Sequence, residues 1–174
     1  NLADAADEVR VFAGKVQAPV GDTLMGKGAF DGTHELFTGM VGMHGTKASN
    51  FGITECELLI VVGARFSDRV TGNTAKFAKN ARILQLDIDP AEINKNIRTD
   101  ASVIGDLKII LRKINTRLDP QNHDEWVNHV ERLKDMYPLS YNKDVLTGPA
   151  VVEAIYEATQ GDAIIVTEVG QHQM

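Results

Sequence analysis

Cysteine is almost absent from this sequence, because Cys56 is the only one among 174 residues. One cysteine cannot form a disulfide within the chain, and no other residues complete the ligand spacing of a zinc site. Basic residues are also in the minority: 18 Lys and Arg against 24 Asp and Glu give a formal net charge of −6. That balance lacks the positive field by which proteins hold a nucleic-acid backbone. The composition therefore argues against disulfide scaffolds, zinc sites and nucleic-acid binding.

Long hydrophobic runs are missing as well. No apolar stretch approaches the roughly 20 residues of a membrane-spanning helix, and the N-terminal segment lacks the basic and apolar regions of a signal peptide. With 43% hydrophobic and 24% charged residues, the chain has an ordinary globular composition. We expect a cytoplasmic protein without a membrane segment. Because the sequence starts without Met and stops abruptly after residues 170–174, we also expect it to be a fragment of a longer polypeptide.

Apolar runs of strand length alternate with segments of helical periodicity. The runs at 58–62 and 83–88 predict buried strands, and a shorter apolar stretch at 19–24 predicts another. Helices are predicted at 4–18, 73–80, 90–97 and 107–118. This alternation predicts an α/β fold with a Rossmann-like, doubly wound parallel sheet.

A second region follows the linker-like dipeptide Asp119-Pro120. Its predicted elements are a helix at 123–136, a loop at 138–147, a helix at 148–159 and a strand at 163–167. The last helix and strand come after a second loop. We therefore expect them to open another domain.

Glycines gather in the loops after the first predicted strand. Gly26 and Gly28 only partly match a dinucleotide-binding fingerprint, because Asp31 takes the place of its last glycine. Around Met43 and His44, three further glycines recur at every third position, namely Gly39, Gly42 and Gly45. The His44 imidazole could donate a hydrogen bond to a ligand here. A surface turn in which His44 has no function explains the spacing equally well.

Charged residues follow the apolar run at 58–62. Arg65 and Arg69 can bind a phosphate or carboxylate through two hydrogen bonds each, and Asp68 could fix one of them. A solvated salt-bridge loop is the alternative. Because ligands bind beyond the carboxyl ends of parallel strands, this segment is a candidate binding site.

Acidic residues follow the next strand. Asp87 stands where an acid accepts hydrogen bonds from a ribose in dinucleotide-binding folds, whereas Asp89 suits an N-cap before Pro90. Asp106 is either a ligand contact or a charge at a helix start. Cys56 is interpreted as a core residue.

Five segments follow one another in a specific order. They are 23–30 (Thr-Leu-Met-Gly-Lys-Gly-Ala-Phe), 39–46 (Gly-Met-Val-Gly-Met-His-Gly-Thr), 63–72 (Gly-Ala-Arg-Phe-Ser-Asp-Arg-Val-Thr-Gly), 87–93 (Asp-Ile-Asp-Pro-Ala-Glu-Ile) and 168–174 (Glu-Val-Gly-Gln-His-Gln-Met). Together they closely resemble the catalytic large subunits of acetolactate synthase, also called acetohydroxyacid synthase. The resemblance covers nearly the whole chain. It departs at Ser67, where many members of the family have an acid.

The resemblance implies a thiamine-diphosphate enzyme that decarboxylates pyruvate and transfers the two-carbon unit to a second 2-keto acid in branched-chain amino-acid biosynthesis. Its cofactors would be thiamine diphosphate, Mg²⁺ and FAD, which performs no net redox chemistry in the main reaction. Residues 1–140 would form a central FAD-binding domain without its first strand, and 146–174 the beginning of the C-terminal thiamine-diphosphate-binding domain. The fragment alone is expected to be inactive, because it lacks the groups that activate thiamine and bind Mg²⁺.

The partners that the resemblance implies are 2-keto acid substrates, further copies in a homo-oligomer and a regulatory small subunit. Two alternatives remain open. The chain could be the central domain of another thiamine-diphosphate carboligase or decarboxylase, or a non-catalytic nucleotide-binding module. The arginine segment 63–72 favours the acetolactate synthase family over the first, and the segment 168–174 argues against the second.

Site residues follow from the resemblance position by position. Arg69 would hold the carboxylate of the second keto acid. The flavin side would be lined by Thr23, Leu24, Gly42, Met43 and His44. The FAD chain and its diphosphate would contact Gly63, Ala64, Arg65, Asp68 and Val70, and the adenosine end would contact Asp87, Ile88, Gly105 and Asp106. Thiamine diphosphate would contact Gly170, Gln171 and His172. No catalytic or metal-binding residue is expected in this chain.

Overall fold

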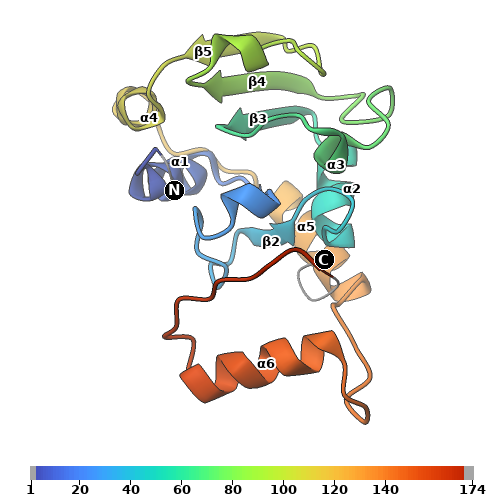
Figure 1. Ribbon diagram of the computed structural model, residues 1–174. Coiled ribbons are helices and arrows are strands. Elements are labelled where there is room, and N and C mark those ends of the chain that lie inside the picture. The colour runs from blue at the N-terminus through green and yellow to red at the C-terminus, as the bar shows by residue number, and fades with distance from the viewer. Residues whose placement is uncertain (1–2, 171–174) are drawn as a thin grey trace. The chain divides into compact units, whose positions relative to one another are not determined.

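The computed structural model describes residues 3–170 of the chain (Figure 1). The chain divides into two compact units at the junction between Tyr137 and Pro138. The first unit contains all five strands and most of the helices. Within residues 138–170, the second unit contains one helix, the loop before it and the segment that follows it.

Five short strands form two parallel sheets in the first unit. They are β1 (Val20–Asp22), β2 (Phe37–Met40), β3 (Leu58–Val62), β4 (Arg82–Asp87) and β5 (Ala101–Ile104). One sheet has the order β1-β2 and the other β3-β4-β5, and all pairs are parallel. The predicted parallel α/β class is confirmed. The strands are divided between two sheets, because no hydrogen-bonded ladder joins β1 to β3 among the described residues.

Helices connect and cover these strands. They are α1 (Ala6–Val16), α2 (Lys47–Glu55), α3 (Asp68–Thr71), α4 (Leu107–Asn115), α5 (Asp124–Met136) and α6 (Gly148–Thr159), with single 3-10 turns η1 (Leu24–Gly26) and η2 (Pro90–Glu92). The predicted helices near 4–18, 107–118, 123–136 and 148–159 are confirmed within a few residues at their ends. α4 begins where the Asp106 carboxylate accepts a hydrogen bond from the Ile109 backbone N–H at 3.0 Å.

Helix α1 packs against both sheets through neighbouring side chains. Phe12 belongs to a buried cluster with Leu86 and Leu111, which joins the three-stranded sheet to α4. Ala13 belongs to a second cluster with Phe30 and Leu36, beside β1 and β2. α1 and α4 therefore cover one face of the three-stranded sheet, and they lie next to each other in Figure 1.

The opposite face of the three-stranded sheet is covered by turns where helices were predicted. Residues 73–80 form consecutive turns in which the Asn73 carbonyl accepts hydrogen bonds from two backbone N–H groups. Ala78, at φ 43°, is only 3% exposed, and Phe77 meets Phe66 edge-on at 5.8 Å. The helix predicted at 90–97 ends after η2, because the chain turns at Asn94 and buries Ile97. Burial of these apolar side chains overrides helical periodicity here.

Two strand predictions also need correction. Residues 163–167 form no strand, because a strand needs a hydrogen-bonded neighbour and the described part of the second unit offers none. Ile164 and Val166 are 96% and 89% exposed. The run at 58–62 is a strand, but it is not buried on both faces: Leu58 is 49% exposed and β3 pairs with β4 alone in the described chain.

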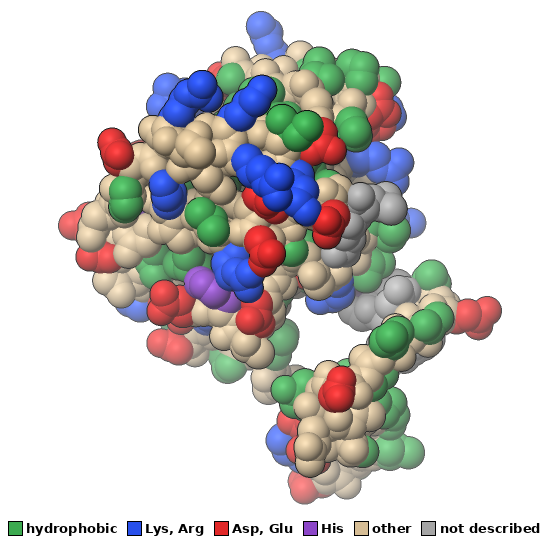
Figure 2. Space-filling model, turned by 90° about the vertical axis from the view of Figure 1, so that its left-hand side faces the viewer, with side chains coloured by type: hydrophobic (Ala, Val, Ile, Leu, Met, Phe, Trp, Pro, Cys, Tyr) green, Lys and Arg blue, Asp and Glu red, His purple; other side chains and the backbone are tan. Residues whose placement is uncertain are grey.

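The second unit has no core in its described part. None of the residues 138–170 is buried. α6 exposes Val152 and Tyr156, and hydrophobic side chains show along the surface of this unit in Figure 2. On the face of the first unit in that view, Lys and Arg side chains are interspersed with Asp and Glu. No helix within residues 3–170 has the length and apolar character to cross a membrane.

Candidate functional site

The glycine turn after β2 is held by the side chain of Asn50. The Gly42 N–H donates to Asn50 Oδ1 at 2.9 Å, and Asn50 Nδ2 donates to the Gly42 carbonyl at 2.9 Å. Gly42 has φ +100°, and a Cβ there would lie 2.4 Å from the Arg69 carbonyl oxygen. Only glycine fits this position. Asn50 was not predicted from the sequence, because an asparagine inside a helix gives no signal for such a contact.

The other two glycines of the triplet also lie against neighbouring groups. A Cβ at Gly39 would meet Thr46 Cγ2 at 2.4 Å, and a Cβ at Gly45 would meet the Met40 carbonyl oxygen at 2.3 Å. The interval of three therefore has a steric explanation. His44 is exposed, and its predicted contact with the flavin remains a prediction.

The turn at 42–44 lies directly against α3. The Met43 N–H donates to the Arg69 carbonyl at 2.8 Å, and Arg69 NH1 lies 3.5 Å from Met43 Sδ. Residues 26 positions apart in the sequence are thus held together by a backbone hydrogen bond and a side-chain contact. Of the predicted residues, the structure brings together Gly42, Met43, Arg69 and Val70.

The end of β1 joins the same region. The Val41 N–H donates to the Asp22 carbonyl at 2.8 Å, so the residue after β2 lies beside the last residue of β1. Thr23 caps η1, because its hydroxyl accepts a hydrogen bond from the Gly26 N–H at 3.1 Å. Leu24 is 42% exposed. The predicted flavin-side residues of both strands therefore share one end of the two-stranded sheet.

The ends of β3, β4 and β5 make a second group. The Gly63 N–H donates to the Leu86 carbonyl at 2.8 Å, and the Gly105 N–H donates to the Asp87 carbonyl at 2.9 Å. A Cβ at Gly63, where φ is +61°, would lie 2.6 Å from Leu107 Cδ1. The predicted contacts at or directly after the ends of these three neighbouring strands are Gly63, Ala64, Asp87, Ile88, Gly105 and Asp106.

Asp87 is the buried acid at this edge. It is 6% exposed, and its Oδ1 accepts a hydrogen bond from the Asp89 N–H at 3.0 Å. Asp89 itself accepts from the Ala91 N–H at 2.9 Å, which confirms its interpretation as an N-cap. Asp106 caps α4, as its interpretation as a helix start predicts. Its contact with a ligand stays a prediction. Ile88 is 68% exposed.

The arginine segment 63–72 contains no salt bridge within the described residues. Arg65 is exposed and makes neither a hydrogen bond nor an ion pair with any of residues 3–170. Asp68 accepts a hydrogen bond from the Arg69 backbone N–H at 3.0 Å and does not bind either guanidinium. The expectation that Asp68 fixes an arginine side chain is therefore wrong, and so is the salt-bridge alternative. Asp68 serves instead at the start of α3, where an acid favours the helix N-terminus.

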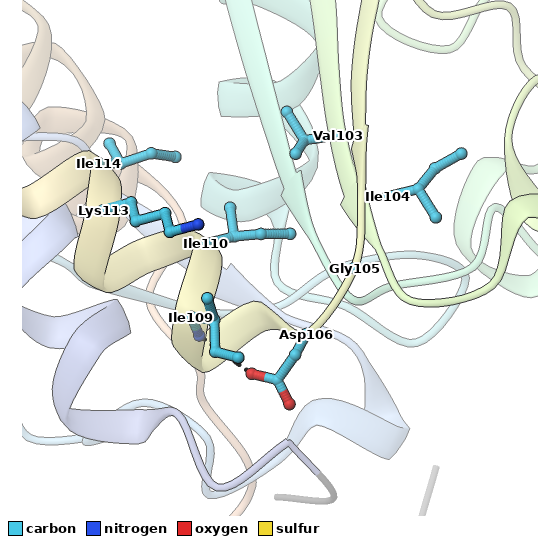
Figure 3. A pocket seen from close by; sticks show the side chains of 8 residues that line it. All are labelled: Val103, Ile104, Gly105, Asp106, Ile109, Ile110, Lys113 and Ile114. Carbon is cyan, nitrogen blue, oxygen red and sulfur yellow. Dashed lines mark hydrogen bonds between the residues drawn. The ribbon is translucent and has the colours of Figure 1, made fainter.

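A shallow apolar pocket adjoins the end of β5 (Figure 3). Its volume is about 360 Å³. Its lining comes from β5, α4 and the two residues between them, namely Val103, Ile104, Gly105, Asp106, Ile109, Ile110, Lys113 and Ile114. Only Gly105 and Asp106 among these were predicted from the sequence. The other predicted residues within residues 3–170 do not line this pocket.

The predicted thiamine-diphosphate contacts come from the last residues of the sequence. Gly170 belongs to the second unit, and Gln171 and His172 lie outside the described residues. Among residues 3–170, no group of three or more His, Cys, Asp or Glu side chains is arranged to hold a metal ion. Burial raises the pKa of Cys56 to about 11. Its Sγ donates to the Ile53 carbonyl at 3.3 Å, as expected of an unreactive packing residue.

Asp22 is a buried carboxylate that sequence reasoning missed. It is 8% exposed, and its Oδ1 has no hydrogen-bond partner within residues 3–170; Lys27 Nζ lies 4.0 Å from that oxygen. Burial raises the pKa of the Asp22 carboxyl above its ordinary value of 3.8, and attraction to Lys27 offsets only part of this effect. The charged form is therefore unfavourable in the folded chain.

Asp22→Asn is expected to stabilise the chain at neutral pH. Because the pKa is higher in the folded than in the unfolded state, the wild type loses stability as pH rises through the folded pKa. The variant should melt roughly 3 °C higher at pH 7, measured by circular dichroism. The difference should shrink as pH falls toward 3.8.

Asp31→Asn provides the matched control, because hydrogen bonds from Thr33 lower the pKa of Asp31. That variant should lose stability at pH 7. A lower melting temperature for Asp22→Asn at pH 7 would contradict the interpretation of Asp22.

This chain is similar to known proteins over nearly its whole length. A model of the family described as "Thiamine pyrophosphate enzyme, central domain" matches residues 1–114. The chain is 45% identical to the acetolactate synthase large subunit of Parasynechococcus marenigrum (strain WH8102), over 98% of this chain and 28% of that protein. It is 42% identical to the large subunit of Lactococcus lactis subsp. lactis (strain IL1403), over 100% of this chain and 31% of that protein.

A third relative is the acetolactate synthase isozyme 2 large subunit of Escherichia coli (strain K12), which is 39% identical over 99% of this chain and 31% of that protein. The chain thus spans about a third of the length of the curated relatives it matches. The resemblance to acetolactate synthase large subunits is confirmed. Since the family match covers most of the first unit, the chain belongs to the family of thiamine pyrophosphate enzyme central domains.

Proposed function

We propose that this chain is part of an acetolactate synthase large subunit and that its first unit binds FAD and positions the second keto acid. The observation that carries the proposal is the contact between the 42–44 turn and Arg69. It joins a predicted cofactor segment to the predicted substrate arginine. The reaction in this proposal is inferred from relatives named acetolactate synthase large subunit.

The strand ends fit the two polar parts of FAD. Arg65 is an exposed cation with no partner among the described residues, which suits a diphosphate. Asp87 is a buried carboxylate with one oxygen held by the Asp89 N–H, which suits a ribose hydroxyl. Gly63 and Gly105 have φ of +61° and +149°, and these positions allow a close backbone approach. FAD would act here as a bound structural group without net redox chemistry in the main reaction.

Arg69 would act on the second 2-keto acid. A guanidinium fork holds a planar carboxylate in one orientation, which fixes the direction in which the keto carbon faces the reacting centre. The backbone bond from Met43 fixes the base of this side chain. Thiamine diphosphate, bound by Gly170, Gln171 and His172 with Mg²⁺ in the longer enzyme, would supply the activated two-carbon unit.

The remaining parts of the proposal concern the longer protein. Residues 1–140 would belong to the central FAD-binding domain and 146–174 to the next domain, which agrees with the division between Tyr137 and Pro138. β1 and β3 each have one hydrogen-bonded neighbour among the described strands, which leaves an edge for the first strand of the family pattern. The enzyme would be a cytoplasmic homo-oligomer with a regulatory small subunit.

Arg69→Lys in the complete enzyme tests this function. Lysine keeps the charge but lacks the planar fork, so acetolactate formed per pyruvate consumed should fall about tenfold. The preference between pyruvate and 2-ketobutyrate as acceptor should weaken, while FAD affinity stays the same. Product analysis by gas chromatography and flavin fluorescence measure the two effects.

Arg132→Lys, on the exposed surface of α5, is the matched control and should behave as wild type. If Arg69→Lys instead lost FAD and kept its acceptor preference, Arg69 would be a cofactor anchor. If the complete protein bound FAD but consumed no pyruvate, a non-catalytic nucleotide-binding module would be the better assignment.

A further inference from the structure

The contact between Arg69 and Met43 has an unusual chemical character. The guanidinium NH1 lies 3.5 Å from the Met43 sulfur, which is a weak, uncharged acceptor. A carboxylate in the same place would neutralise the arginine. The thioether orients the side chain and leaves its positive charge available for an anion.

Two further observations make this contact specific. The Met43 N–H donates to the Arg69 carbonyl, so both backbones are fixed relative to each other. Gly42 packs so closely against Arg69 that the turn at 42–44 has no space to move toward α3. Met43 is nevertheless 60% exposed, so its side chain is open to small oxidants in solution.

We propose that Met43 is an oxidation site that controls Arg69: its sulfoxide withdraws the guanidinium from the anionic ligand. The consequence for the enzyme rests on the function proposed above. A sulfoxide oxygen is a strong acceptor that projects from the sulfur, and it therefore forms a firm hydrogen bond with the neighbouring guanidinium. Oxidation thus converts a weak contact into a competitor for the carboxylate.

The oxidant is a peroxide. A sulfur lone pair attacks one oxygen of hydrogen peroxide, the S–O bond forms and the O–O bond breaks. The departing hydroxide takes a proton and leaves as water. The sulfur is oxidised by two electrons and the peroxide is reduced by two. Methionine sulfoxide reductases reverse the change, one enzyme for each epimer.

The test follows the reactivity of the arginine itself. The chain is oxidised with hydrogen peroxide until mass spectrometry shows complete conversion of Met43 to its sulfoxide. It is then labelled with phenylglyoxal, which modifies guanidinium groups. Labelling of Arg69 should slow at least about threefold, because its guanidinium is now engaged in a stronger hydrogen bond. Arg65 has no methionine contact and should be labelled at an unchanged rate. Treatment with both sulfoxide reductases should restore Arg69.

Variants separate Met43 from the other methionines. Met43→Leu leaves Met136, which is 59% exposed, and Met25, which is 83% exposed, free to oxidise. Peroxide should then have no effect on Arg69 labelling. Met43→Gln places a permanent amide oxygen near the guanidinium, and it should slow labelling without any oxidant.

Unchanged labelling of Arg69 in fully oxidised chain would overturn the proposal, and so would an equal peroxide effect in Met43→Leu. The complete enzyme distinguishes this failure from failure of the proposed function. If oxidation slows Arg69 labelling but leaves acceptor preference intact, the oxidation site stands and the substrate role of Arg69 is wrong.

Discussion

Gly42→Ala is expected to destabilise the first unit by about 3 kcal/mol. The new methyl group would lie 2.4 Å from the Arg69 carbonyl oxygen and 3.0 Å from Val70 Cα, which are backbone atoms that no side-chain rotation can move aside. The φ of +100° adds strain for any residue with a Cβ. Thermal unfolding followed by circular dichroism should show a fall of roughly 10 °C in Tm.

Gly14→Ala is the matched control for this prediction. Gly14 lies inside α1, and a Cβ there has no atom within 4 Å. Alanine favours a helix by roughly 0.5–1 kcal/mol over glycine, so this variant should melt higher than wild type. The same loss of stability in both variants would show that the close approach of Gly42 to Arg69 does not exist in solution.

Arg65→Ala in the complete enzyme should weaken FAD binding by roughly ten- to a hundredfold. A charge-assisted hydrogen bond to a phosphate contributes on the order of 1.5–3 kcal/mol, and about 1.4 kcal/mol corresponds to a factor of ten in affinity. Since Arg65 has no partner within residues 3–170, its removal leaves no unpaired protein group behind. The expected loss is therefore one of binding, without a loss of folding stability.

Flavin fluorescence titration measures this affinity, and thermal unfolding of the apoprotein provides the second readout. Arg132→Ala is the matched control, because it removes an exposed arginine from α5. The affinity of wild type should also fall with added salt, since phosphate contacts are screened. An unchanged FAD titration for Arg65→Ala would place this residue on the surface outside the cofactor site.

Local patterns determined the elements whose stability comes from neighbouring residues in sequence. The amphipathic spacing of 107–118 predicts α4, because it puts the apolar side chains on one face of a helix, which packs against the core. Leu111 on this face is fully buried. Asp89 before Pro90 predicts a cap, because the contact lies within three residues. The apolar runs predict β3 and β4. Arg65 follows β3 directly, and its position at a strand end required no tertiary information.

Contacts between distant segments decided the rest. Residues 73–80 form turns because Phe77 and Ala78 fill a core built by other segments, and β5 exists because β4 pairs with it although all its residues are exposed. α2 was not expected from the sequence, since its apolar residues are few; Thr46 caps it through the Ser49 N–H.

The candidate site shows the same division. The roles of Arg65, Arg69 and Asp87 are predicted from the sequence alone, because residue type and position at or shortly after a strand end are local features. The parallel α/β class and the family follow from the sequence, and the anion-binding roles of Arg65 and Arg69 are predictions made from it. Tertiary structure alone decided that Asn50 holds Gly42, that Asp22 is buried and that Met43 contacts Arg69. The physical reason is that these depend on close packing of segments far apart in the chain, which periodicity and local propensity do not encode.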